Sequence, residues 1–206
     1  MIQLKWLVAG FATLFASSAL AAIIGVSDGG RLIDAPAVID DDSIMCTAFS
    51  PEQSCEMLGF DEKQGVSLAA PLEVDGGEIL GGDVNSHMIF LNTEGRLFAS
   101  LSVDWWFDGK IIGVMSDRNG KLEAASSELL GAGGTSYPAS FWLRGLERND
   151  SYSVAGNLFT LNSRVKEPGD WVRVVTRAMI PTPPSWLLGL GILIVAFAGR
   201  VRRTSC

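Results

Sequence analysis

The stretch LFASLSVDWWF, residues 97–107, alternates between apolar and polar side chains almost without interruption. Every odd position is apolar, and the even positions are polar at Ser100, Ser102 and Asp104, with Phe98 and Trp106 as the exceptions. A period of two over this length is typical of a long strand with one buried face. Asp108-Gly109 follows, a pair that favours a tight type I′ turn. We therefore expect residues 110–115 to return as the antiparallel partner in a hairpin.

Other short segments with the composition of strands lie on both sides of this predicted hairpin. Strands are predicted at residues 87–91, 141–146 and 171–177, weaker ones at 37–39 and 66–72, and a second hairpin at 152–155 and 158–162 around Gly156-Asn157. Residues 122–130 are rich in good helix formers and are predicted as one short helix. Together these segments predict an all-β fold, an antiparallel β-sandwich or jelly-roll-like domain with that helix.

The chain divides into four parts by composition. We expect a signal peptide at residues 1–21, an irregular lead-in with few strands at 22–84, a β-rich extracellular domain at 85–178 and a sorting tail at 180–206. Glycine pairs at 76–77 and 81–82 are typical of loops and interrupt the lead-in.

The charge of the chain is concentrated in its middle. The formal net charge is −7, but residues 1–21 and 182–206 hold four of the 16 basic residues and none of the 23 acidic ones, so the remainder carries −11. Binding to nucleic acid needs clustered Lys and Arg against the phosphates, so this balance argues against nucleic acid as a partner. It also argues against docking on an anionic lipid surface.

The N-terminus has the three parts of a secretory signal peptide. Lys5 provides a basic start, residues 6–20 carry no charge, and Ala19 and Ala21 are the small residues that precede a cleavage site. The apolar run is shorter than the roughly 20 residues that a membrane span needs. We therefore expect cleavage after Ala21 rather than a retained anchor.

The C-terminus combines prolines, an apolar helix and a basic cluster. Residues 186–199 are apolar throughout, after Pro181, Thr182, Pro183 and Pro184 and before Arg200, Arg202 and Arg203. A helix of this length spans about 21 Å, which is short for a bilayer core of about 30 Å. The arginines predict a transmembrane helix whose terminal end stays cytoplasmic, with the domain on the other side of the inner membrane.

This order of elements resembles the PEP-CTERM sorting domain, the substrate of exosortases, although Pro181-Thr182-Pro183 stands where the family has Pro-Glu-Pro. The resemblance implies a transient anchor in the inner membrane of a Gram-negative bacterium. It also implies cleavage near residues 181–184 by an exosortase-like enzyme, and a cell-surface or extracellular location, often alongside exopolysaccharide. Residues 85–178 resemble a domain joined to such tails that has no assigned biochemical activity, through the motifs IGVMSD (112–117) and EPGDW (167–171).

Three cysteines are present. Cys46 and Cys55 lie nine positions apart in the part predicted to be exported, and Cys206 is the last residue. An oxidising compartment favours a disulfide between Cys46 and Cys55. Closing a loop of about ten residues stabilises a fold by roughly 2–3 kcal/mol.

Catalytic patterns are weak in this sequence. His87 is the sole histidine, it begins an apolar segment, and no G-x-S-x-G motif is present, so we interpret it as a hydrogen-bonded structural residue. Trp105, Trp106, Trp142 and Trp171 could stack on sugars, but tryptophans on strands usually belong to a core. Because neighbours on a strand face opposite sides, Trp106 beside Asp104 is the best candidate for a carbohydrate contact.

Three hypotheses for function remain open. The first is a non-enzymatic structural or adhesive protein of the cell surface or extracellular matrix that contacts exopolysaccharide. The second is a secreted carbohydrate-active or other hydrolytic enzyme, which would need paired carboxylates. The third is a module for a small ligand or calcium, for which residues 40–42 and 83–85 offer loop carboxylates and amides. The sequence implies no organic cofactor and no specific metal ligands.

Overall fold

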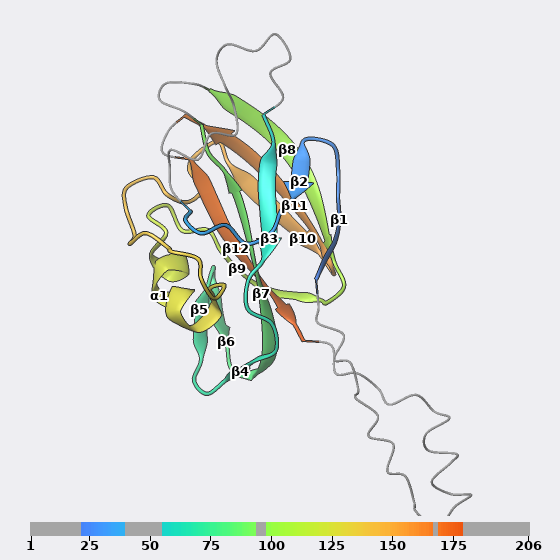
Figure 1. The fold of residues 1–206 in the computed structure, drawn as a ribbon, viewed down its shortest axis with the longest axis vertical. Helices are drawn as coiled ribbons and strands as arrows, with labels where there is room; N and C mark the ends of the chain where they lie inside the picture. The colour runs from blue at the N-terminus through green and yellow to red at the C-terminus, as the bar shows by residue number, and fades with distance from the viewer. Residues whose placement is uncertain (1–21, 40–54, 94–97, 167–168, 179–206) are drawn as a thin grey trace, which may run out of the picture. The chain divides into compact units, whose positions relative to one another are not determined.

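The computed structural model describes residues 22–39, 55–93, 98–166 and 169–178, and twelve strands and one helix lie within them (Figure 1). The prediction of an all-β fold with one short helix is confirmed, and every strand pair but one is antiparallel. The predicted signal peptide, residues 1–21, and the predicted sorting tail, residues 180–206, lie outside the described residues.

The first sheet, sheet A, has four strands in the order β1-β8-β11-β10. They are β1 (Ile23–Val26), β8 (Ala99–Phe107), β11 (Leu158–Val165) and β10 (Ser151–Ala155). β8 lies in the interior of this sheet and corresponds to the long strand that the alternation of residues 97–107 predicts. The predicted hairpin around Gly156-Asn157 is confirmed as β10 and β11.

The second sheet, sheet B, has its strands in the order β2-β3-β7-β12-β9. They are β2 (Gly30–Leu32), β3 (Met57–Asp61), β7 (Gly82–Leu91), β12 (Asp170–Arg177) and β9 (Ile111–Met115), and β4 (Val66–Leu68) also pairs with β7. β2 runs parallel to β3. A separate small hairpin consists of β5 (Leu72–Val74) and β6 (Gly77–Ile79).

Sheets A and B pack face to face around the main apolar core. Trp105 at its centre is fully buried, and a Cβ atom placed on Gly59 of β3 would lie 2.4 Å from its ring. The absence of a side chain at Gly59 therefore lets the indole lie against the opposite sheet. The other core residues come from both sheets and include Ile23, Ile89, Leu91, Val103, Phe107, Val114, Phe159, Leu161, Val172 and Val174.

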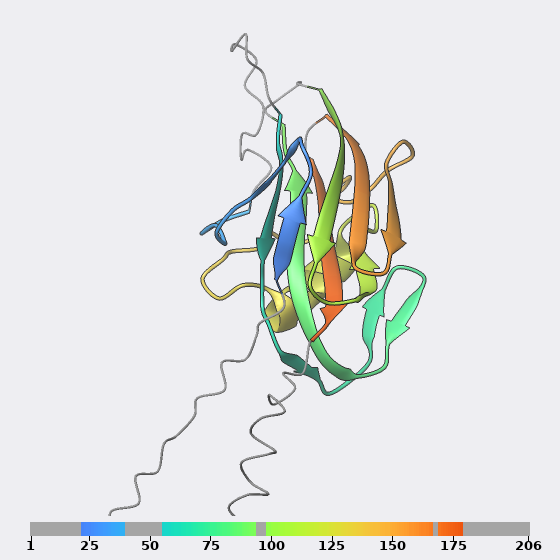
Figure 2. The ribbon, with the colours of Figure 1, turned by 90° about the vertical axis from the view of Figure 1, so that its right-hand side faces the viewer.

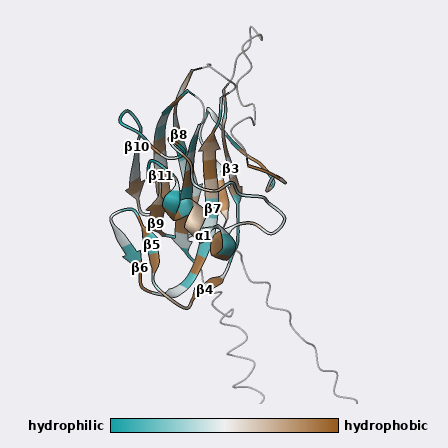
Figure 3. Ribbon diagram, turned by 90° about the vertical axis from the view of Figure 1, so that its left-hand side faces the viewer, coloured by the Kyte–Doolittle hydropathy of each residue, from teal (hydrophilic) through white to brown (hydrophobic). Residues whose placement is uncertain are grey.

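Sheet B is covered on its second face as well. The helix α1 (Lys121–Leu130), the β5–β6 hairpin and the irregular segments 33–39 and 131–141 pack there, and Figure 3 shows α1 and the hairpin in front of this sheet. β7 and β12 are consequently buried over most of their length. Figure 2 looks from the opposite side onto sheet A, whose outward-pointing side chains are mostly exposed.

The hairpin predicted around Asp108-Gly109 is wrong. β8 belongs to sheet A, whereas β9 pairs with β12 in sheet B, so the turn carries the chain from one sheet to the other. The amides of Phe107 and Ile111 donate to the carbonyls of Asn157 and Gly156 in the β10–β11 turn, rather than to each other. Alternation predicted the buried face of residues 97–107 correctly, but it contains no information about the partner strand.

Four further predictions need correction. Residues 141–146 form no strand: Leu143 adopts a left-handed backbone conformation with φ 66°, and Arg144 turns inward to bind carbonyls. Residues 22–84 are not an irregular lead-in, because they contain β1 to β6 and supply strands to both sheets. Residues 37–39 form only a bridge from Val38 to Ser136, and of residues 66–72 only β4 is a continuous strand. The helix at 122–130 and the last strand are confirmed.

Candidate functional site

Both residues that were predicted from the sequence to contact a ligand lie on the outward side of sheet A. Asp104 and Trp106 point away from the core on β8, and their partners on β11 are Thr160 and Leu158. We call the outward side chains of strands β8, β10 and β11 the outer face; they are Ser100, Ser102, Asp104, Trp106, Ser151, Ser153, Ala155, Leu158, Thr160, Asn162 and Arg164. The prediction that Trp105 and Trp106 face opposite sides is confirmed, since Trp105 is fully buried and Trp106 is 36% exposed.

The indole of Trp106 lies against β1 at a position where that strand has a glycine. Gly25 of β1 is its register partner, and a Cβ atom there would lie 3.5 Å from the ring. Because glycine leaves this space open, the ring packs over the backbone of β1 and not over another side chain. This contact limits the orientations of the ring while part of it stays accessible.

Polar side chains on the outer face are small and lie in register. The hydroxyl of Thr160 donates to Asp104 Oδ1 over 2.6 Å, and Ser102 lies opposite Asn162 one pair further along. The backbone amide of Asp104 donates to the hydroxyl of Ser27 in the turn after β1. Hydroxyls and amides both donate and accept hydrogen bonds, so this face matches a ligand rich in hydroxyl groups.

His87 is buried in the middle of β7, as its interpretation as a structural residue requires. Its Nδ1 lies 2.6 Å from Asp61 Oδ1 and its Nε2 lies 3.1 Å from the hydroxyl of Thr176. The order carboxylate, imidazole, hydroxyl matches that of a hydrolytic triad. However, His87 and Thr176 are both fully buried, so a substrate has no access to the hydroxyl.

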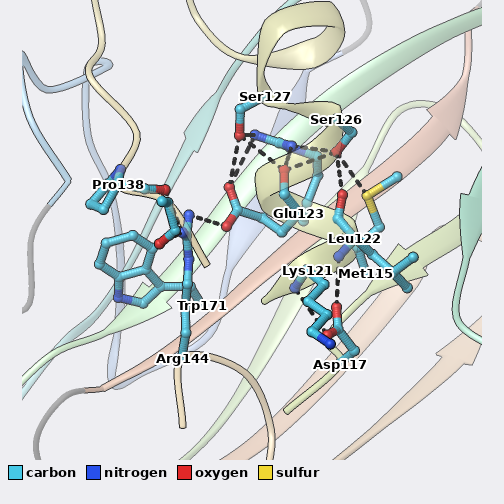
Figure 4. Close-up of polar contacts among 12 residues, drawn as sticks. Met115, Asp117, Lys121, Leu122, Glu123, Ser126, Ser127, Pro138, Arg144 and Trp171 are labelled. Carbon is cyan, nitrogen blue, oxygen red and sulfur yellow. Dashed lines mark hydrogen bonds and ion pairs between the residues drawn. The ribbon is translucent and has the colours of Figure 1, made fainter. Parts of the chain in front are cut away.

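A buried network of charges beneath α1 was not predicted. Arg173 of β12 binds the Glu62 carboxylate through two nitrogens, at 2.7 and 2.8 Å, and donates to the carbonyl of Glu123 and to Ser126 at 2.6 Å each. Arg144 pairs with the other side of Glu123, donates to the carbonyls of Pro138 and Ala139, and lies over the ring of Trp171 (Figure 4). The sequence offered no sign of this network, because its members are far apart along the chain.

The network shifts the acid–base properties of its members in different directions. Burial raises the pKa of Glu123, although Arg173 and Arg144 act against that shift. Burial lowers the pKa of Arg144. Burial acts in the same sense at Arg173, but Glu62, Glu123 and Tyr137 together outweigh it, so the pKa of that guanidinium is raised. Each charge is held by neighbours on several elements, so the network anchors α1 and the following loop to sheet B.

A second buried carboxyl lies at the start of β12. Asp170 is 4% exposed and accepts a hydrogen bond from the Ser163 hydroxyl on β11. Burial raises the pKa of Asp170 to about 8, and the carboxylates of Asp150 and Glu147 act in the same sense. Paired carboxylates of this kind are what a glycosidase requires, but Asp170 faces the space between the sheets.

The remaining predicted sites are separate from the outer face. Cys46 lies outside the described residues, so its disulfide with Cys55 stays a prediction; Cys55 is half-buried against the core before β3. Residues 40–42 also lie outside. Asp83 accepts from the Ser67 hydroxyl, and Asn85 accepts from the amide of Gly65, both on strand β7. Within the described ranges, no three His, Cys, Asp or Glu residues gather into a group that could hold a metal ion.

Comparison with protein-family models, with curated proteins and with solved structures returns no match to this chain. In the part of the chain that the structure describes, no helix has the length and apolar character needed to cross a membrane. The processing residues Ala21, Pro181, Thr182, Pro183, Pro184, Arg200, Arg202 and Arg203 lie outside that part.

Proposed function

We propose that this chain is an exported bacterial surface protein whose β-sandwich domain binds a polysaccharide without catalysing a reaction. The signal-peptide pattern at residues 1–21 and the resemblance of residues 180–206 to an exosortase substrate support export, transient anchoring in the inner membrane and release at the cell surface. The binding part of the proposal rests on the outer face of sheet A.

The observation that carries the binding proposal is Trp106 packed over Gly25 beside a row of small polar side chains. A flat aromatic surface suits the apolar face of a sugar ring, and the neighbouring Asp104, Thr160 and Asn162 suit its hydroxyl groups. Sheet B, by contrast, has both of its faces covered. A long polymer can lie along an open, flat face, whereas a hydrolase would enclose its substrate in a cleft.

The hydrolytic alternative is supported less well. The sole histidine, His87, has both ring nitrogens in contact with Asp61 and Thr176 and is closed off from solvent. The calcium alternative has no ligand group to support it among the described residues.

Binding is tested by affinity electrophoresis of the full chain through gels containing dextran or methyl-esterified pectin. Retardation that Trp106→Ala weakens about tenfold or more supports the proposal, because a central tryptophan contact commonly contributes that much. Leu80→Ala is the control, since Leu80 is 76% exposed and lies outside sheet A, between β6 and β7. Equal retardation of both variants and the parent would contradict a site at Trp106.

Export is tested by the intact mass of the protein in each cell fraction of its native host. A species that starts near residue 22 and ends near residue 181, found outside the inner membrane, is the expected product. A species that keeps residues 186–206 and occurs in the inner membrane alone would contradict sorting, and the domain would then be a tethered periplasmic one.

A further inference from the structure

A polar pocket lies at one end of the outer face. It has a volume of about 440 Å³ and is lined by Arg118, Arg148 and Arg164 together with Glu147 and Asp150. Arg118 comes from the turn before α1, residues 147–150 form the turn before β10, and Arg164 stands on the outer face near the end of β11. The pocket is therefore continuous with the surface of Trp106 and Asp104 through Arg164.

The three arginines of this pocket are available to a ligand. Among the residues that the structure describes, none of their guanidinium groups forms an ion pair or a hydrogen bond. The other polar pocket of comparable size differs in this respect: its Arg31 is paired with Glu56, and its Asp61 contacts His87. Three unpaired cations in one pocket are unusual in a chain whose net charge is −7.

Aromatic rings hold two of the arginines in place. The guanidinium carbon of Arg118 lies 4.2 Å from the ring centre of Trp142, and that of Arg164 lies 4.9 Å from the ring centre of Phe98. Stacking occupies the flat face of a guanidinium but leaves the N–H groups along its edge free to donate. Each of these two guanidinium groups is therefore oriented before a ligand arrives, which lowers the side-chain entropy lost on binding.

The acidic residues of the pocket do not cancel this positive charge. Asp150 has both carboxylate oxygens engaged, since they accept from the backbone amides of Glu147 and Arg164 at 2.8 and 2.7 Å. Asp150 thus shapes the turn and ties it to β11. Burial raises the pKa of Glu147, although Arg118 acts in the opposite sense. The three arginines of the lining outnumber its two carboxylates.

We propose that this pocket binds the carboxylate of an acidic sugar, so that the polysaccharide recognised by the outer face is one containing uronic acid units. Planar arginine forks match a carboxylate through two parallel hydrogen bonds. Trp142 and Phe98, both more than half exposed, lie against Arg118 and Arg164 of this pocket and add flat apolar surface next to them. This inference rests on the proposed function, because a chain that crosses Trp106 reaches Arg164 at the end of the same face.

The test compares the full chain on polygalacturonate, on methyl-esterified pectin, in which the carboxylates are neutralised, and on dextran sulfate. We expect polygalacturonate to bind about tenfold or more tightly than its ester, and Arg118→Gln and Arg164→Gln each to remove most of that difference while binding to the ester is unchanged. The matched control is Arg31→Gln, an exposed arginine already paired with Glu56, which leaves both affinities as they are.

Each outcome of this comparison separates the two proposals. Equal binding of polygalacturonate and its ester, with both lost in Trp106→Ala, would overturn the carboxylate inference and leave polysaccharide binding intact. Equal binding of dextran sulfate through the same arginines would overturn carboxylate selectivity in favour of a general anion site. Binding of none of the polymers would overturn the proposed function itself.

Discussion

Arg144 and Arg173 beneath α1 differ from Arg118, Arg148 and Arg164 around the pocket in almost every physical respect. The first two are fully buried, and carboxylates, carbonyls and hydroxyls surround their nitrogens. The other three are exposed, and the guanidinium groups of Arg118 and Arg164 lie over aromatic rings. A buried arginine must find all its partners within the fold, whereas an exposed one can keep its donors for another molecule.

All five residues are arginines, so their residue type does not distinguish structural from binding roles. The burial of each guanidinium group does. Removing one partner of a buried pair leaves the other charge stranded in a medium of low polarity. Removing an exposed arginine strands nothing, because water replaces the lost contact. The following predictions use stability to test this division, from the largest expected effect to the smallest.

Arg173→Met removes the central cation of the buried network. We expect the free energy of unfolding to fall by about 3–5 kcal/mol, because Glu62 is left buried without its partner. Urea denaturation followed by tryptophan fluorescence measures this change. The double variant Arg173→Met with Glu62→Gln should recover part of the loss, and a loss below about 1 kcal/mol for the single variant would remove the structural role of the pair.

Asp170→Asn tests the buried carboxyl whose pKa lies at about 8. In the unfolded chain this group ionises near pH 4, so the folded state keeps its proton longer and the stability it contributes is lost as pH rises from about 4 to 8. Relative to the parent, Asp170→Asn should therefore gain on the order of 2–4 kcal/mol between pH 5 and pH 8. Urea titrations at both pH values measure it, and parallel pH profiles would show that Asp170 ionises normally.

Tyr137→Phe removes one hydroxyl from the edge of the buried network. This hydroxyl accepts from the amide of Ala132 over 2.8 Å and lies beside Glu62, which together with burial raises its pKa. We expect a loss of about 1–2 kcal/mol in the free energy of unfolding, because a half-buried amide is left without its protein acceptor. Tyr152→Phe, whose hydroxyl meets the more accessible Asp75 at 3.1 Å, is the comparison variant and should lose less. A larger loss of unfolding free energy in Tyr152→Phe than in Tyr137→Phe would contradict this expectation.

Arg118→Gln and Arg148→Gln should each change the free energy of unfolding by less than about 0.5 kcal/mol. Both side chains are exposed and no ion pair with a described residue depends on them. Thermal melts of each variant beside Arg173→Met measure the contrast directly. A loss comparable to that of Arg173→Met would place the pocket arginines in the framework of the fold and not in a binding site.

Local patterns predicted the local elements of this fold. The alternation of residues 97–107, the Gly156-Asn157 turn and the helix formers after Lys121 each correspond to an observed element. Apart from β4, the strands before residue 82 were missed because they are three to five residues long, too short for a period of two to appear. The hairpin predicted at Asp108-Gly109 was wrong for a different reason. A turn propensity does not specify which sheet the next strand joins.

Among the candidate sites, too, the one with a local sequence pattern was predicted and those that depend on long-range contacts were not. Trp106 and Asp104 were found from the sequence because strand alternation places them on one side of β8. The arginine pocket was not found, because Arg118, Arg148 and Arg164 come from three separate elements and meet only in the folded chain. The pairing of Arg173 with Glu62 spans 111 residues and has no local signal at all. Long-range charge pairing is the information that a single sequence lacks.

The last strand of the domain, β12, lies between β7 and β9 in sheet B. A ribosome or a translocon delivers a chain from its N-terminus. Residues 170–177 therefore emerge after all the other strands of the described domain. Until they arrive, β7 and β9 each present an open edge, and the partner of Glu62 is missing from the interior. The strand pairing of sheet B is therefore complete only when the whole domain has emerged. A chain truncated before β12 cannot complete this sheet.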